Sequence, residues 1–349
     1  MLFRVAAVLV VVAFAIAISV SVEADAVSSR KNKAQMNQLV SMLPNSDMVI
    51  TIHSSRMLGE ALPMILGGNG STLAEVMSKI ESIKQKVGVD VHQFEYAAVG
   101  LGIKDAGNNS YRFEPAVIAR GSFDPAAVIA SAKTASNGKY REERFDGKVI
   151  YIFNIKDLKD NTADSVGSSG KWYSSLFDGM SDEVAVAVMS PNTIAIGTAE
   201  RVRQTVEANS RVAAEIIELL NKREVAVMNI AGRVPNGLSK FLPLDDDELG
   251  RSIDSIKFVY GGMDIADNSA TISLSARTEK NADAQLLSET LIGLKTLGVG
   301  LLGGSKRADQ QLYARLINNV TFTRSGSVLT LEIKIPRSDL NALTAELAK

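Results

Sequence analysis

The side chains best suited to metal chemistry are His53 and His92, because they are the only histidines and the chain has no cysteine. A zinc site would have to take its other ligands from Asp or Glu, and no His-Glu-x-x-His spacing occurs. A histidine at the surface or at a strand end is the simpler interpretation of each. We therefore expect no metal site and no cofactor.

The densest acidic run is Asp245-Asp246-Asp247-Glu248. It lacks the alternating oxygen ligands and the glycine of a calcium loop. Acidic side chains are favoured in the first turn of a helix, where they face the positive end of the helix dipole. We interpret the run as a solvated helix start rather than a calcium site.

Nucleophile and phosphate-loop motifs are also missing. No Gly-x-Ser-x-Gly occurs, and the nearest approach, Gly167–Gly170, is one residue short and lies within the polar stretch 157–170, an expected exposed loop. The glycine-rich segment Gly298–Gly304 lacks the lysine-serine ending of a phosphate loop and follows a helix instead of a strand. We predict no catalytic residue and favour a protein that is not an enzyme.

Two arginines are the only candidate binding residues. Arg56 and Arg233 fall at roughly matching positions after the similar strands that begin at Val49 and Val225, if one extra residue is allowed. They could hold an anion symmetrically between two copies of one unit. Solvated arginines at strand ends are the alternative.

The segment from Leu286 to Leu302 is unusually apolar for a surface helix. Glu289 and Lys295 oppose its insertion across a membrane. We favour a buried core helix whose small residues allow close packing. An apolar groove or a docking surface for a partner is the alternative.

The elements that would position these residues follow one pattern twice. The order strand, helix, strand, strand, helix, strand is expected between Val49 and Ile155, and a looser copy follows Glu224. The first copy is expected to contain strands at 49–52, 97–103, 115–120, 140–145 and 149–153 and helices at 73–87 and 126–135. The second is expected to contain strands at 225–233, 258–264, 270–276, 320–324 and 327–335 and helices at 248–256 and 283–302.

This pattern predicts an α+β fold of two tandem βαββαβ units that resemble ferredoxin-like halves, with mainly antiparallel sheets and helices packed on one face. At 349 residues the chain is long enough for two such units. We expect a mobile leader at 27–43, a first unit at 44–222 with an added hairpin and helix, and a second unit at 223–349.

The first residues indicate export. A short basic start at Met1–Arg4 precedes the uncharged run Val5–Val22, and Ala24-Asp25-Ala26 has the small-x-small pattern of a signal-peptidase site. We interpret residues 1–26 as a signal peptide. The alternative is an anchor in the inner membrane formed by residues 5–22, a run of 18 residues that would span about 27 Å as a helix. Both place the body of the protein in the periplasm or outside the cell.

Composition narrows the range of partners. The formal net charge is -1, so electrostatics gives no support to nucleic-acid binding. Without cysteine, an exported chain must be stabilised by packing alone. We expect membrane contact only if the N-terminal segment is retained.

Two internal stretches carry a resemblance. The entry Leu43-Pro44-Asn45-Ser46-Asp47 and the hairpin Ser190–Gly197, which feeds Glu200-Arg201-Val202, resemble those of an uncharacterised class of exported bacterial proteins. The resemblance implies no known activity and no functional residues. The function we expect is non-enzymatic binding of an envelope protein or an apolar ligand outside the cytoplasm. The alternatives are an envelope hydrolase with dispersed acidic residues and a membrane-tethered assembly factor.

Overall fold

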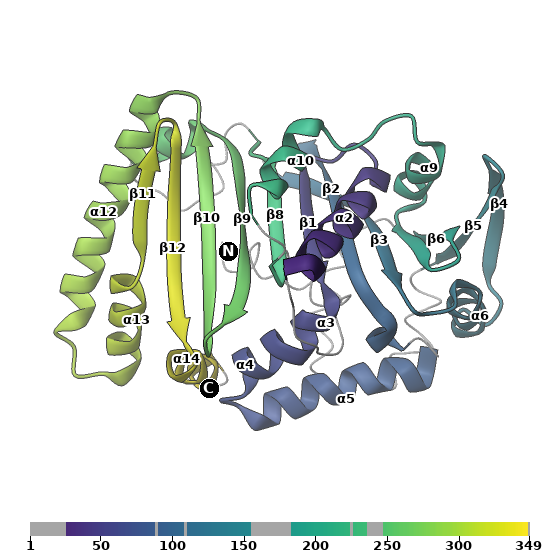
Figure 1. Cartoon of the computed structure of the whole chain (residues 1–349), viewed down its shortest axis with the longest axis horizontal. Coiled ribbons are helices and arrows are strands. Elements are labelled where there is room, and N and C mark those ends of the chain that lie inside the picture. Colours follow the sequence, from purple (N-terminus) through teal and green to yellow (C-terminus); the bar gives the residue numbers. More distant parts are fainter. Residues whose placement is uncertain are drawn as a thin grey trace. The chain divides into compact units, whose positions relative to one another are not determined.

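The computed structural model describes residues 26–87, 90–107, 110–154, 183–223, 226–235 and 247–347 (Figure 1). The chain divides into two compact units: unit 1 comprises 1–59 and 77–218, and unit 2 comprises 60–76 and 219–349. The division between residues 218 and 219 lies close to the expected boundary at 222. The assignment of 60–76 to unit 2 was not expected. The N-terminal 25 residues, the loop 157–170, Asp245 and Asp246 lie outside the described residues.

The described strands of unit 1 form one antiparallel sheet in the order β1-β2-β3-β7-β6-β5-β4. They are β1 (Met48–His53), β2 (Phe94–Gly107), β3 (Ser110–Gly121), β4 (Tyr140–Phe145), β5 (Lys148–Asn154), β6 (Glu183–Ser190) and β7 (Thr193–Gly197). The helices are α2 (Ala26–Met42), α3 (Ser54–Arg56), α6 (Pro125–Ala135) and α9 (Ala199–Glu207). A π-helical turn, Met57–Ala61, follows α3, and a 3-10 turn, Val91–Gln93, precedes β2. Helices α5 (Gly70–Val87) and α10 (Ala214–Asn221) contain residues of both units.

Unit 2 has a smaller antiparallel sheet in the order β8-β9-β10-β12-β11. Its strands are β8 (Met228–Arg233), β9 (Ile256–Ala266), β10 (Ser269–Thr278), β11 (Thr321–Ser325) and β12 (Val328–Pro336). Its helices are α4 (Leu62–Leu66), α11 (Asp247–Asp254), α12 (Asn281–Gly303), α13 (Ala308–Asn318) and α14 (Arg337–Leu347). Segment 60–76 joins this unit because α4 packs on α14, and a Cβ at Gly68 would lie only 2.4 Å from Asn341 Cα.

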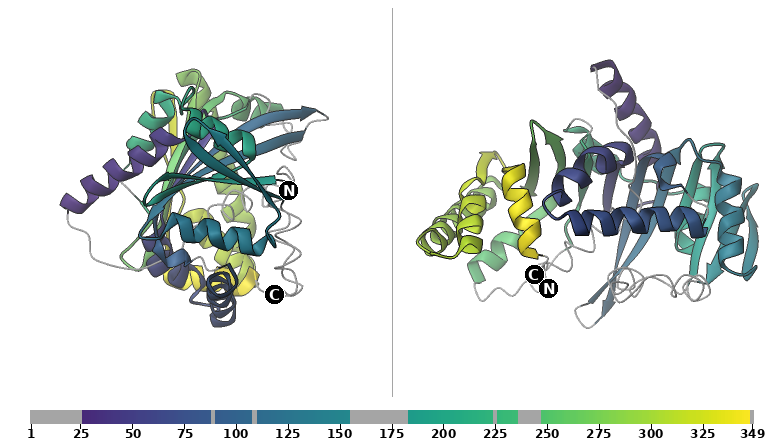
Figure 2. Two further views of the ribbon diagram at one scale, coloured as in Figure 1. Left: turned by 90° about the vertical axis from the view of Figure 1, so that its right-hand side faces the viewer. Right: turned by 90° about the horizontal axis from the view of Figure 1, so that it is seen from below.

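Residues 27–43, expected to be a mobile leader, instead form most of α2. The correction has a simple cause: Met36, Leu39, Val40 and Leu43 recur at helical spacing and are buried against the sheet of unit 1. Tyr96 Oη donates to Asn32 Oδ1 at 2.7 Å at the start of this contact. The first turns of α2 project past the sheet in both views of Figure 2.

Local turn chemistry agrees with the sequence. Asp146 and Gly147 have φ values of 47° and 73° between β4 and β5, as a tight hairpin requires. Asp267 and Asn268 have φ values of 49° and 57° between β9 and β10. The Asp124 carboxylate caps α6 by accepting from the Ala126 N–H at 2.9 Å. Element types and turns are therefore as predicted at these points.

The α+β class with antiparallel sheets is confirmed, but the ferredoxin-like duplication is not. A ferredoxin-like unit joins parallel strands through its helices. Here β1 and β2, joined through helices, are antiparallel neighbours, and β12 returns antiparallel to β10 after α12 and α13. The order of elements along a chain does not fix the order of strands in a sheet, so the sequence pattern could not distinguish these arrangements.

Candidate functional site

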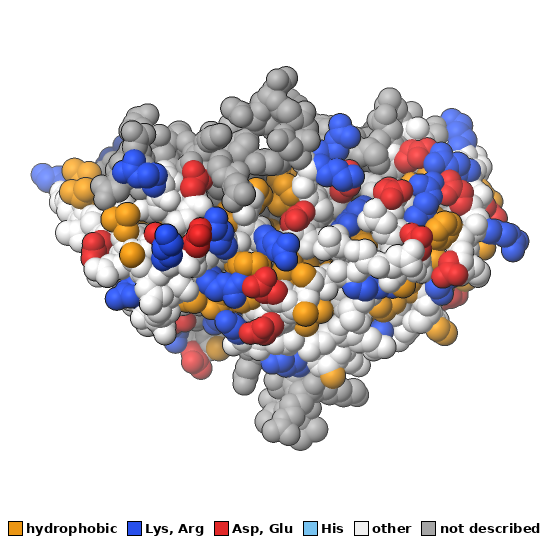
Figure 3. Space-filling view, turned by 90° about the horizontal axis from the view of Figure 1, so that it is seen from above, with side chains coloured by type: hydrophobic (Ala, Val, Ile, Leu, Met, Phe, Trp, Pro, Cys, Tyr) orange, Lys and Arg blue, Asp and Glu red, His pale blue; other side chains and the backbone are white. Residues whose placement is uncertain are grey.

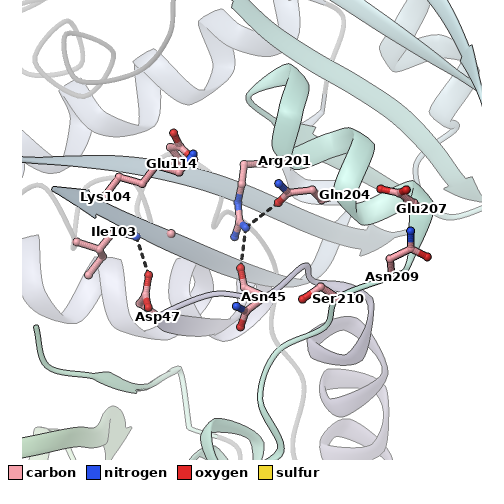
Figure 4. A pocket seen from close by; sticks show the side chains of 11 residues that line it. Asn45, Asp47, Ile103, Lys104, Glu114, Arg201, Gln204, Glu207, Asn209 and Ser210 are labelled. Atoms are coloured by element: carbon pink, nitrogen blue, oxygen red, sulfur yellow. Dashed lines mark hydrogen bonds and ion pairs between the residues drawn. The ribbon is translucent and has the colours of Figure 1, made fainter. Parts of the chain in front are cut away.

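Unit 1 contains a polar pocket of about 340 Å³ (Figure 4). The loop before β1, the strands β2 and β3, the helix α9 and the loop after it enclose this pocket. It is lined by Asn45, Asp47, Gly102, Ile103, Lys104, Glu114, Arg201, Gln204, Glu207, Asn209 and Ser210.

Arg201 is the buried charge of the pocket, with only 4% of its surface exposed. Thr198 caps α9, and its Oγ1 accepts from the Arg201 N–H at 3.3 Å, which fixes Arg201 in the first turn. The neighbours on the same face, Val202, Thr205 and Val206, are also buried. Arg201 therefore occupies a position on the helix stripe that faces the sheet, where an apolar residue is usual.

The Arg201 guanidinium bonds to neutral groups. Nη1 donates to the Asn45 carbonyl at 2.6 Å and to Gln204 Oε1 at 3.1 Å, and Nη2 donates to Ser46 Oγ at 2.7 Å. The buried Nε has no hydrogen-bond partner among the described residues. Burial lowers the pKa of Arg201, and the negative charges of Glu114 and Asp47 act in the opposite direction. The side chain is thus a desolvated cation that forms no ion pair with the residues that the structure describes.

Two glycines of β2 leave room for this arrangement. A Cβ at Gly100 would lie 2.4 Å from Ser46 Oγ, so a side chain there would displace the serine that binds Arg201. A Cβ at Gly102 would lie 3.7 Å from Arg201 Cζ, an ordinary contact distance. The absence of a side chain at Gly102 therefore keeps the space next to the guanidinium open.

The other charged groups of the pocket are mostly acidic. Asp47 Oδ2 accepts from the Ile103 N–H at 2.8 Å, and Lys104 Nζ lies 2.8 Å from Glu114 Oε2. Glu207 lies at the exposed end of α9. Three carboxylates and two cations therefore line the pocket.

The pocket joins the two stretches that carried the sequence resemblance. Residues 43–47 form its loop, and Glu200-Arg201-Val202 supplies its arginine. The two segments are also tied through the backbone, since the Asn45 N–H donates to the Ser210 carbonyl at 3.1 Å. Sequence reasoning missed Arg201, although an arginine at a stripe position of an amphipathic helix was an available signal.

A second unusual region lies on α12 in unit 2. Its apolar strip, defined as Leu294, Leu297 and Leu301, is exposed by 47%, 63% and 79%. Ile292, exposed by 47%, lies at the opposite edge of the exposed side of the helix. The prediction of a buried core helix is wrong, because only 6% of the most apolar 18-residue window of α12 is buried. The buried residues of α12, Ala284 and Leu287, lie near its start.

The second half of α12 carries little charge. Lys295 is the only charged residue between Thr290 and Ser305. Its Nζ donates to the Val320 carbonyl at 2.6 Å, so it is held against the connection between α13 and β11. The second half of α12 therefore presents an uncharged apolar surface to solvent.

The two candidate arginines lie in different units. Arg56 ends α3 in unit 1, and Arg233 ends β8 in unit 2. The Arg233 guanidinium lies 5.8 Å from the centre of the Phe258 ring, and that of Arg277 lies 4.2 Å from the same ring. The polar pocket contains neither Arg56 nor Arg233, and their shared anion site stays a prediction.

The histidines and the described part of the acidic run, Asp247 and Glu248, occupy ordinary positions. The His53 ring at the end of β1 lies 4.8 Å from the Tyr96 ring, and the His92 N–H donates to Asp90 Oδ1 at 3.0 Å in a short turn. Asp247 begins α11, as the helix-start interpretation requires. Within the described ranges, no three His, Asp or Glu side chains are grouped so that they could hold a metal ion.

Charges of both signs are mixed on the face drawn in Figure 3. A mixed surface of this kind produces no field of one sign that would attract a polyanion.

Comparison with known proteins gives no family. No protein-family model matches the chain, and no curated protein matches its sequence. Among solved structures, crystal form I of TP0453 has a TM-score of 0.41 and 12% identity over 89% of this chain and 98% of that chain. Crystal form III of TP0453 has a TM-score of 0.43 and 10% identity over 88% and 97%. A likeness this weak transfers no residue role and no activity.

Proposed function

We propose that this chain is an exported, non-enzymatic envelope protein that attaches to a lipid surface through the apolar strip of α12. The observation that carries the proposal is the exposure of four large apolar side chains on the second half of α12, up to 79% at Leu301. Exposed apolar surface of this kind marks interaction sites.

The energetics suit attachment rather than insertion across the membrane. Burying one large aliphatic side chain fully contributes about 1.5–3 kcal/mol, so four partly exposed ones could supply several kcal/mol. The first turns of α12 carry Asp283 and Glu289 and pack on unit 2 through Ala284 and Leu287. A helix fixed to its own protein on one side can lie in the membrane interface but cannot cross the bilayer alone.

Basic residues stand at both ends of the helix. Lys280 precedes α12 and Lys306 follows it, and both are exposed. Each lysine near an anionic lipid surface contributes about 1 kcal/mol. This arrangement favours a surface with some anionic headgroups.

The proposal changes one expectation from the sequence. We expected membrane contact only if residues 1–26 were retained, because we expected α12 to be buried. Cleavage after Ala26 would remove only the first residue of α2 from the described elements. The exposed strip on α12 would remain, so the cleaved chain would still have an apolar surface for membrane contact. Export itself stays a prediction from the signal pattern.

Vesicle flotation tests the proposal. The chain beginning at Val27 is mixed with vesicles of phosphatidylethanolamine and phosphatidylglycerol in equal parts. Replacing Leu297 and Leu301 together by Asn should weaken binding about tenfold or more, since each loses most of its transfer free energy. Met77→Asn is the matched control, because Met77 is an exposed apolar residue on another helix, α5. Equal binding by the double variant and the control would refute the proposal.

A partner helix is the second candidate occupant of the strip. Gly293 and Gly300 lie on the exposed half of α12, and a Cβ at either would meet no atom within 4 Å. Glycine inside a helix costs about 1 kcal/mol relative to alanine, and glycine on a helix face allows a second helix to approach closely. Replacing both by Ala should leave vesicle binding unchanged but weaken binding of a partner helix.

A further inference from the structure

The polar pocket of unit 1 is a separate site that the proposed attachment of α12 does not use. Its lining residues all belong to unit 1, whereas the apolar strip belongs to unit 2. Its volume of about 340 Å³ is sufficient for a small polar molecule.

Among the described residues of this pocket, no carboxylate pairs directly with Arg201. A buried cation is costly unless it is paired and fully hydrogen-bonded. The three bonds to Asn45, Ser46 and Gln204 go to neutral oxygens, and the Nε–H has no partner among the described residues. A carboxylate on a ligand would supply the missing negative charge through charge-assisted hydrogen bonds.

The rest of the lining argues against a simple anion. Lys104 and Glu114 neutralise each other at 2.8 Å, which leaves Asp47 and Glu207 as the remaining negative charges of the lining. A polyanion would be repelled by these carboxylates. A ligand with an ammonium group as well as a carboxylate would satisfy both signs.

We propose that the pocket binds a small zwitterion of amino-acid or dipeptide size, with its carboxylate at Arg201 and its ammonium group facing Glu207, which lies on the opposite side of Arg201 from Asp47 (Figure 4). The open space next to Gly102 admits the carboxylate to the guanidinium. Asn209 and Ser210 supply neutral polar groups on the side of the loop after α9 (Figure 4).

Saturation-transfer NMR with a matched set of probes tests this proposal on the full chain. The probes are alanyl-alanine, its N-acetyl form, which is an anion, and its C-terminal amide, which is a cation. Alanyl-alanine at millimolar concentration should bind, and each blocked form should bind about tenfold more weakly, because a charge-assisted hydrogen bond is lost. Absence of binding, or equal binding of a blocked form, would overturn the proposal.

Variants locate the binding. Gly102→Val should abolish binding, since its side chain would fill the space next to Arg201 without removing the hydrogen bonds of that residue. Glu207→Gln should weaken binding several-fold, whereas Glu218→Gln, an exposed residue of α10 outside the lining, should not. If Gly102→Val fails to fold, the two glutamate variants decide the question. Vesicle flotation should be unchanged in Glu207→Gln, so the two proposals can fail separately.

Discussion

The polar pocket and the apolar strip depart from the usual distribution of side chains in opposite directions. The pocket buries the charged Arg201 to 4% exposure, and the strip exposes Leu301 by 79%. Six of the eight large apolar side chains exposed among the described residues belong to unit 2, and Met77 and Tyr140 are the two in unit 1. Hydrogen bonds inside unit 1 offset part of the cost of Arg201, whereas the described contacts of the strip offset little. The strip therefore has the stronger need of an external partner.

The largest expected effect comes from comparing the two ends of α12. Leu287→Ala should lower the free energy of unfolding by about 3 kcal/mol, because Leu287 is buried and a cavity would remain. Leu301→Ala should change it by less than about 0.5 kcal/mol. Urea denaturation of both variants measures the difference. Similar losses would mean that the outer side of α12 is packed in solution.

The next comparison concerns two arginines of α9. Arg201→Ala should lower the free energy of unfolding by about 2–3 kcal/mol, because the bonds to the loop before β1 are lost. Arg203 is half-buried and pairs with Glu143 at 2.8 Å, so Arg203→Ala should cost less than about 1 kcal/mol. Thermal denaturation of the two variants side by side gives the ranking, and an equal cost would contradict a special role of Arg201.

A smaller effect of opposite sign is expected at the exposed glycines. Gly300→Ala should raise the free energy of unfolding by up to about 1 kcal/mol, since nothing occupies the position of the new Cβ. Gly261→Ala is the contrasting change, because its Cβ would lie 2.0 Å from the Ser273 carbonyl oxygen and should destabilise β9. Chemical denaturation measures the change in the free energy of unfolding for both variants, which should be positive for Gly300→Ala and negative for Gly261→Ala. Loss of stability in Gly300→Ala would indicate an unseen contact on the strip.

The smallest effect is a pH dependence near α9. The hydrogen bond from Arg203 lowers the pKa of Glu143, and Arg141 acts in the same direction. A carboxyl group whose folded-state pKa is lowered stabilises the fold above its unfolded pKa of about 4.3, and this stability is lost as the pH falls through the folded value. Glu143→Gln should therefore be less stable than the parent at neutral pH, with the difference shrinking below about pH 4. A constant difference across this range would exclude the ion pair as its cause.

Much of the local structure was accessible from the sequence. The alternation and turn residues predicted the strands around Asp146-Gly147 and Asp267-Asn268, and Asp124 with Pro125 predicted the start of α6. The missed helices have identifiable causes. The apolar positions of α2 occupy only its second half, after a polar and basic beginning, and α14 lies beyond the last expected strand.

The sequence by itself determined most of the elements, because periodicity, caps and turns act between residues a few positions apart. It also determined the charge balance and the predicted export signal. Only the tertiary structure decided the strand order, the burial of Arg201 and the exposure of α12. These properties depend on which distant segments pack together, as when residues 43–47 meet Arg201, and a local pattern carries no information about its long-range neighbours. An apolar helix has the same sequence whether its outer side faces a core or water.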